Sequence, residues 1–230
     1  MTKKILIVIT SHNRLGNTGR RTGFHYEELA TPFRRFHEAG FSIQIASLKG
    51  GLPPHDPSSL ELLETVPDDV VWFRADQLAM ALLGQSSAVS ETDFSEFDAV
   101  FFPGGHGAVF DLPYDKVLTA KLGKFFDAGK LIGAVCHGPS VLLNTRGANG
   151  LPIVEGLRVN AFTNAEETAV QLTGVVPVLL EDGLREQGAR YVHGGLWESF
   201  AVRDKNLVTG QNPQSAARVA ELMIEVLLEK

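Results

Sequence analysis

The chain has 230 residues, 44% of them hydrophobic and 21% charged, which suits one large α/β domain with a sizeable core over residues 1–230. The formal net charge of −6 argues against a nucleic-acid or anionic-membrane partner, and no apolar run approaches the roughly 20 residues that span a bilayer. A single cysteine excludes an intramolecular disulfide framework, and the apolar stretch near the amino terminus is too short for a signal peptide, so we expect a reducing, cytoplasmic setting.

Short apolar runs rich in Val, Ile and Phe alternate with amphipathic stretches along the chain. The runs predict strands at residues 4–9, 42–46, 99–102, 131–135, 158–162 and 206–208. Apolar residues at helical spacing predict helices over residues 28–39, in part of 68–90 and over 213–230. This alternation indicates βαβ units around a mostly parallel sheet, and therefore an α/β fold.

The first strand runs into a polar loop over residues 10–19, at the edge of the sheet where open α/β folds bind their ligands. Glycines 16 and 19 of this loop come without the lysine and the length of a phosphate-binding loop, and the Rossmann glycine pattern is not satisfied there. We therefore expect a site at this edge and no nucleotide or other cofactor.

Cys136 follows the apolar run at residues 131–135 and precedes a helix-like segment. Ala134 and Gly138, two positions to either side, supply the small residues that a nucleophile elbow needs, because the bend brings their backbones together. Pro139 suits the first turn of a helix, whose free N–H groups would favour thiolate and lower the pKa of Cys136. The competing interpretation is a small buried hydrophobic residue, which we consider less fitting beside His137.

Backbone N–H groups for an oxyanion can come from two places. The amide of His137 follows the elbow directly, and the glycines of residues 102–107 follow another strand at the same edge. The His137 side chain needs a third group to orient its ring. Glu28, Glu166 and Glu167 are carboxylates near expected helix starts, where a capping role is the ordinary one.

The other histidines show no metal-ligand spacing, so we predict no metal site. His12 and His25 flank the first loop, where they would line the mouth of the site, although a solvated structural role is the ordinary one for each.

The segments at residues 102–107 and 134–139 together resemble the ThiJ/PfpI superfamily. This resemblance implies the class I glutamine amidotransferase-like fold, a flavodoxin-like three-layer sandwich with a nucleophile elbow. Four further segments are similar to the glutathione-independent glyoxalase and heat-shock chaperone members, and the match spans essentially the whole chain in order: residues 22–32, 46–51, 162–167 and 209–213.

The resemblance also implies roles for particular residues. Glu28 would share a proton with the nucleophile Cys136, and Glu167 would orient His137, although Glu166 is an alternative for this position. The amides of Gly105 and His137 would form the oxyanion hole, and His106 would line the substrate pocket. Longer chaperone members hold a metal in extra segments that have no convincing counterpart here. Relatives of this kind commonly form homodimers.

The function that the resemblance implies is that of a cofactor-independent lyase of the glyoxalase III type. Such an enzyme converts methylglyoxal or a related 2-oxoaldehyde to a 2-hydroxy acid through a cysteine hemithioacetal. One alternative is a cysteine amidase or peptidase that uses Cys136, His137 and Glu167 as an acyl-transfer triad. Another is a non-enzymatic, redox-sensing holdase in which Cys136 is oxidised.

Overall fold

The structure is a computed structural model that describes residues 2–229. A seven-stranded sheet with the order β3-β2-β1-β4-β5-β9-β8 runs through it. Neighbouring strands pair in parallel, except for the antiparallel pair of β8 and β9. The predicted mostly parallel sheet is therefore confirmed. The strand bounds are β1 Lys4–Ile9, β2 Ser42–Ser47, β3 Ser87–Ala88, β4 Ala99–Phe102, β5 Leu131–Val135, β8 Ala201–Asp204 and β9 Leu207–Gly210.

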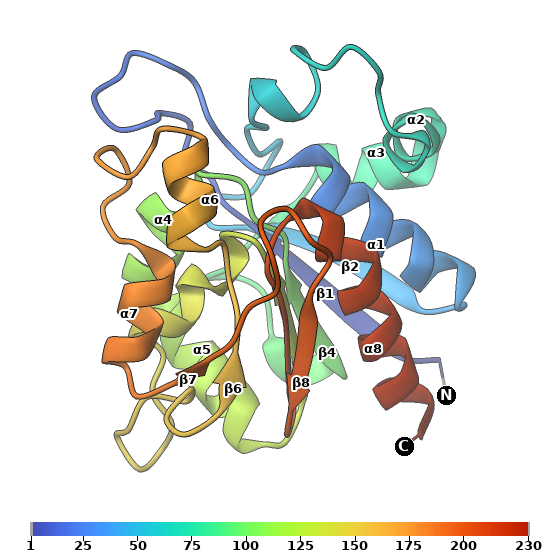
Figure 1. Cartoon of the computed structure of the whole chain (residues 1–230). Coiled ribbons are helices and arrows are strands. Elements are labelled where there is room, and N and C mark those ends of the chain that lie inside the picture. Colours follow the sequence, from blue (N-terminus) through green and yellow to red (C-terminus); the bar gives the residue numbers. More distant parts are fainter. Residues whose placement is uncertain (1, 230) are drawn as a thin grey trace.

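Helices cover both faces of this sheet, which gives the three layers (Figure 1). One face carries α1 (Tyr26–Glu38), α2 (Asp68–Ala75), α3 (Gln77–Gly84) and α8 (Ala216–Glu229). The other face carries α4 (Ala108–Asp111), α5 (Lys116–Asp127) and α7 (Leu180–Glu186), with α6 (Asn164–Ala169) beside α7. Short 3-10 helices complete the chain: η1 Pro57–Ser59, η2 Phe94–Glu96, η3 Leu112–Tyr114, η4 Gly138–Asn144 and η5 Pro213–Ser215.

The alternation of side chains along β1 explains why both faces are covered. Ile5 and Ile7 lie in the hydrophobic core under α1 and α8, whereas Leu6 and Val8 lie in the core on the opposite face. All four side chains are fully buried. A strand that is apolar at every position is stable only when both of its faces are covered, so the run that predicted this strand also predicts its central place in the sheet.

The strand predicted over residues 158–162 is wrong in extent and in partner. Only β6, Arg158–Val159, is a strand, and it pairs with β7, Arg190–Tyr191, in a separate two-stranded sheet. After β6 the backbone N–H groups bond to other partners instead of a neighbouring strand. The Asn160 N–H donates to the Thr209 hydroxyl, and the Phe162 N–H donates to the carbonyl of Cys136. These bonds bring Phe162 to the site instead of extending the strand.

The helix boundaries also differ from the predictions. The first helix begins at Tyr26, which places Glu28 within its first turn. At the other end of the chain the predicted helix divides into η5 and α8, and the capping box of Asn212 and Ser215 fixes the turn. Residues 68–90 contain α2, α3 and the edge strand β3, in agreement with a segment that is helical in part.

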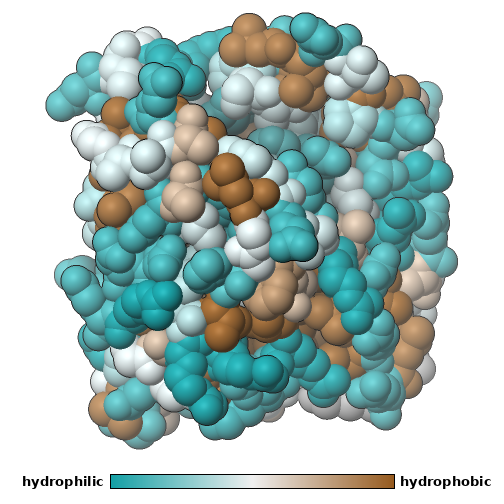
Figure 2. All heavy atoms as spheres, in the orientation of Figure 1, coloured by the Kyte–Doolittle hydropathy of each residue, from teal (hydrophilic) through white to brown (hydrophobic). Residues whose placement is uncertain are grey.

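The visible face of the molecule is mostly hydrophilic, with hydrophobic residues in small separate groups (Figure 2). Among the helices of residues 2–229, none combines the length and the apolar character that crossing a membrane requires. That the chain forms one domain stays a prediction.

Candidate active site

The carboxyl ends of β1, β4 and β5 lie next to one another and bring three loops together. The loop after β4 carries Gly104, Gly105 and His106, and the turn after β5 carries Cys136 and His137. Because β2 and β4 lie on opposite sides of β1, the sheet reverses its winding at this point. Open α/β sheets bind ligands at such a switch point.

Cys136 occupies a strained turn. Its φ of 58° is in the left-handed region, where a residue with a Cβ is held only by its surroundings. The Cys136 N–H donates to the carbonyl of Gly210 at 2.9 Å, and a Cβ at Gly138 would overlap the carbonyl oxygen of Phe102. The turn therefore has the nucleophile-elbow geometry that the sequence predicts.

The predicted lowering of the Cys136 pKa is wrong. Cys136 is only 3% exposed, and this burial raises the pKa of its thiol well above the ordinary value, with a further increase from the adjacent Glu28 carboxylate. The segment after the elbow is the short 3-10 helix η4, whose N–H groups do not outweigh these two effects. The resting nucleophile is therefore a thiol.

Glu28 extends from the first turn of α1 to the elbow and is fully buried. The Gly104 N–H donates to its Oε2 atom at 2.7 Å. Burial raises the pKa of the Glu28 carboxyl to about 8, although the Gly104 N–H and the Cys136 thiol act in the opposite direction. A carboxyl and a thiol that both hold protons at neutral pH thus lie side by side.

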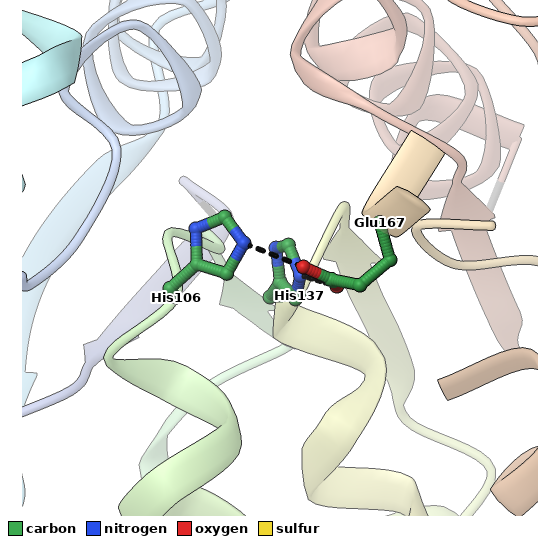
Figure 3. A group of neighbouring side chains, drawn as sticks. All are labelled: His106, His137 and Glu167. Atoms are coloured by element: carbon green, nitrogen blue, oxygen red, sulfur yellow. Dashed lines mark hydrogen bonds and ion pairs between the residues drawn. The ribbon is translucent and has the colours of Figure 1, made fainter. Parts of the chain in front are cut away.

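The His137 ring connects the thiol to a second carboxylate. Its Nδ1 lies 3.2 Å from the Cys136 sulfur, and its Nε2 lies 2.8 Å from Oε2 of Glu167. The other oxygen of Glu167 lies 3.0 Å from Nε2 of His106, so one carboxylate contacts both histidines (Figure 3). Burial alone would raise the pKa of Glu167, but the two rings lower it to about 2. Glu167 is therefore an anion.

This charge fixes the tautomer of His137. Burial lowers the pKa of the His137 ring, so the ring is neutral near pH 7 and carries one N–H. An anionic Glu167 accepts that N–H at Nε2, which leaves the lone pair of Nδ1 directed at the Cys136 sulfur.

Glu166 turns away from His137 and accepts five hydrogen bonds. It has no exposed surface, and it forms a capping box with Thr163 at the start of α6. Of the two carboxylates that the sequence left open, Glu167 is therefore the one in contact with His137. The donors to Glu166 are the backbone and hydroxyl of Thr163, the backbone of Trp197 and the side-chain amides of Gln211 and Asn212.

We expect Glu166→Ala to destabilise the protein by about 3 kcal/mol or more, because it leaves several buried donors without an acceptor. Glu167→Gln loses a charge that the two histidine rings stabilise but keeps an oxygen and an amide group, so it should lower the unfolding midpoint less than Glu166→Ala. Urea unfolding of both variants checks this ranking, and an unchanged midpoint for Glu166→Ala would contradict it.

His106, His137 and Glu167 also form a group that is able to hold a metal ion. Their ligand atoms all lie within 4.8 Å of one another, although the sequence predicted no metal. In the structure each histidine Nε2 is already paired with its own oxygen of Glu167. Each oxygen of Glu167 therefore has a histidine partner, and the absence of a metal stays a prediction.

The two predicted oxyanion donors lie at this site. Gly105 has a φ of 95°, and a Cβ there would overlap the carbonyl oxygen of Gly23, so the loop requires glycine. Within residues 2–229, neither the Gly105 amide nor the His137 amide donates a hydrogen bond. Their role as an oxyanion hole stays a prediction.

His25 is closer to the centre of the site than its sequence context indicated. It precedes α1, and its Nδ1 lies 3.7 Å from Oε1 of Glu28. The available signal was its position three residues before Glu28, which places both side chains on one face of a helical turn. His12, the other histidine of the first loop, stacks instead on Phe110.

The chain is similar to several known proteins over most of its length. The model of the DJ-1/PfpI family matches residues 21–226. Glyoxalase 3 of Candida albicans is 30% identical over 228 residues, which cover 96% of this chain and 97% of that protein. Glutathione-independent glyoxalase hsp3101 of Schizosaccharomyces pombe is 32% identical over 236 residues, which cover 97% of this chain and 95% of that protein.

A solved structure shows the same fold. The crystal structure of glyoxalase III from Candida albicans superimposes with a TM-score of 0.89 at 30% sequence identity. The superposition covers 97% of this chain and 96% of that one. The flavodoxin-like α/β architecture that the sequence predicts is therefore confirmed.

Proposed function

Because the chain belongs to the DJ-1/PfpI family, we propose that it is a glutathione-independent glyoxalase that converts methylglyoxal or a related 2-oxoaldehyde to a 2-hydroxy acid. The names of its relatives at about 30% identity support this proposal. The observation that carries it is the buried pair of Cys136 and Glu28 beside a neutral His137, since aldehyde isomerisation needs both a nucleophile and a base.

The first step is addition of the Cys136 sulfur to the aldehyde carbon, C1. The Nδ1 lone pair of His137 takes the thiol proton and passes it to the C1 oxygen, which gives a hemithioacetal. Glu167 holds the ring in the required tautomer. The amides of Gly105 and His137 would stabilise the charge on the C1 oxygen as it develops.

The second step is transfer of hydrogen from C1 to C2. The Glu28 carboxylate removes the C1 hydrogen, and the same carboxyl then returns a proton to C2. The C2 oxygen takes up the proton that the C1 hydroxyl releases, so the enzyme neither gains nor loses a proton. Hydrolysis of the resulting thioester by water gives the hydroxy acid and restores the thiol.

The two alternative functions use fewer of these features. An acyl-transfer triad of Cys136, His137 and Glu167 is present in outline, but amide hydrolysis has no need for the second acid, Glu28, on the thiol. A redox sensor needs an accessible thiolate, whereas Cys136 is buried and its pKa is raised. Both observations favour the glyoxalase.

The test is methylglyoxal consumption without glutathione, with lactate measured as the product. We expect turnover by the wild type, and an inactive wild type would contradict the proposal. Release of ammonia from amide substrates would then support hydrolysis instead.

The proposal also includes a homodimer that forms through the exposed faces of α1 and α8. Analytical ultracentrifugation tests this association.

A further inference from the structure

Two buried polar atoms at the site remain without partners. Nδ1 of His25 and Oε1 of Glu28 have no hydrogen-bond partner among residues 2–229. They lie 3.7 Å apart, too far to bond each other directly. A buried polar atom without a partner is costly, and in an enzyme it often marks the place of a substrate atom.

One hydroxyl oxygen can satisfy both of them, because it accepts from the Nδ1–H of His25 and donates to the Oε1 of a Glu28 carboxylate. Hydrogen bonds of about 2.8 Å can converge on a single oxygen from two atoms 3.7 Å apart, since the three atoms form an open triangle. Oε2 of the same carboxyl is already held by the Gly104 N–H, so Oε1 is the oxygen that remains for chemistry. The position between His25 and Glu28 is thus suited to a substrate oxygen that accepts from His25 as a carbonyl and donates to Oε1 once it has become a hydroxyl.

The backbone holds His25 firmly in this position. Its N–H donates to the carbonyl of Gly104 at 3.0 Å, and its carbonyl accepts from the Leu29 N–H in α1. The loop after β4 and the first turn of α1 are therefore tied together at His25. The side chain is 23% exposed although Nδ1 is buried, so the ring joins the site interior to its mouth.

The ring is uncharged under working conditions. Burial lowers the pKa of His25 to about 4, with an opposing contribution from Asp56. A neutral imidazole with its proton on Nδ1 is a donor that loses no charge when it bonds to an oxygen. The pairing of a carboxylate base with a neutral histidine donor operates in the same way in triosephosphate isomerase.

Resting on the proposed glyoxalase function, we propose that His25 is a further catalytic residue whose Nδ1–H binds the C2 oxygen of the 2-oxoaldehyde. When Glu28 removes the C1 hydrogen, the electron pair of the C–H bond moves toward the C2 carbonyl and negative charge collects on its oxygen. His25 donates a hydrogen bond to that oxygen throughout, and no covalent bond to the ring forms. The requirement for a C2 oxygen makes this contact specific for 2-oxoaldehydes over simple aldehydes.

The test compares His25→Leu, which lacks a donor, with His25→Asn, whose amide nitrogen reaches the place of Nδ1. We expect kcat for methylglyoxal to fall about 100-fold in His25→Leu, as for loss of one oxyanion donor, and to recover to within about tenfold of wild type in His25→Asn. The isotope effect on kcat with C1-deuterated methylglyoxal should increase in His25→Leu, because hydrogen transfer becomes slower than the other steps.

Alkylation of Cys136 by iodoacetamide separates this role from a structural one, since it reports only on the elbow and the thiol. We expect the alkylation rate of His25→Leu to stay within about twofold of wild type. His37→Ala is the control, because His37 is an exposed residue of α1, and this variant should match wild type in every assay. A His25→Leu enzyme with wild-type kcat, or with a lower kcat but an unchanged isotope effect, would overturn the proposal. An inactive wild type would overturn the proposed function itself.

Discussion

Replacing Cys136 with alanine is expected to lower methylglyoxal turnover by about 10⁴-fold or more, because no other group at the site can form the covalent intermediate. His137 and Glu167 serve this thiol and have no nucleophile to activate without it. Lactate production by the purified variant is the measurement. Turnover within tenfold of wild type would show that the reaction does not pass through the sulfur.

The fold of the Cys136→Ala variant should survive. Alanine has the same left-handed strain at a φ of 58° as cysteine, so the main loss is the packing of one sulfur atom. We expect a change of about 1–2 kcal/mol in the free energy of unfolding. The double variant Cys136→Ala/His137→Ala should be no less active than the single one, because groups that act as a unit lose their effect together.

The sequence predicted the position of the nucleophile better than its chemistry. A tight turn at Cys136 requires small residues at 134 and 138, and both are present, so the elbow could be inferred from local sterics. The pKa of Cys136 depends on burial and on Glu28, which lies 108 residues earlier in the chain, and neither is visible in the residues around the cysteine. The argument from nearby residues therefore predicted a lowered pKa for Cys136, whereas its pKa is raised.

For Glu166 and Glu167, too, the sequence predicted the position of the residues better than their roles. Glu166 and Glu167 both occupy the first turn of α6, and sequence cannot say which one faces His137. The choice is made by Trp197, Gln211 and Asn212, which bind Glu166 from distant parts of the chain and leave Glu167 for the histidine. In the same way, residues 160–162 leave the predicted strand because their partners are Thr209 and the elbow.

Glu28→Gln is expected to lower kcat about 10³-fold while leaving the nucleophile in place, because an amide cannot take the C1 hydrogen. Above pH 8 the wild-type Glu28 carboxyl is ionised, and this like charge, which raises the thiol pKa, is absent from the variant. Alkylation of Cys136 at such a pH should therefore be faster in Glu28→Gln than in wild type. Lactate production and iodoacetamide alkylation, measured side by side, check both statements. Loss of both activities together would indicate a misfolded site instead.

The same substitution should change how stability depends on pH. A carboxyl with a native pKa of about 8 keeps its proton between pH 4.5 and 8, whereas the unfolded chain loses it near pH 4.5. The native state then binds more protons, so the free energy of unfolding falls as pH rises through this window, by up to about 5 kcal/mol at 1.36 kcal/mol per pKa unit. Glu28→Gln removes this contribution.

Urea unfolding at pH 5 and pH 8 should therefore show Glu28→Gln gaining stability relative to wild type at the higher pH. Glu38→Gln is the matched control, since Glu38 lies at the other end of α1 and is exposed. If the difference between Glu28→Gln and wild type were the same at both pH values, the Glu28 carboxyl would titrate in the native protein as it does in the unfolded chain.

Wild-type kcat/KM should rise toward pH 8, because the carboxylate that acts as base forms only as the pKa of Glu28 is approached. The protonated carboxyl that costs stability when it ionises is thus the same group that supplies the base.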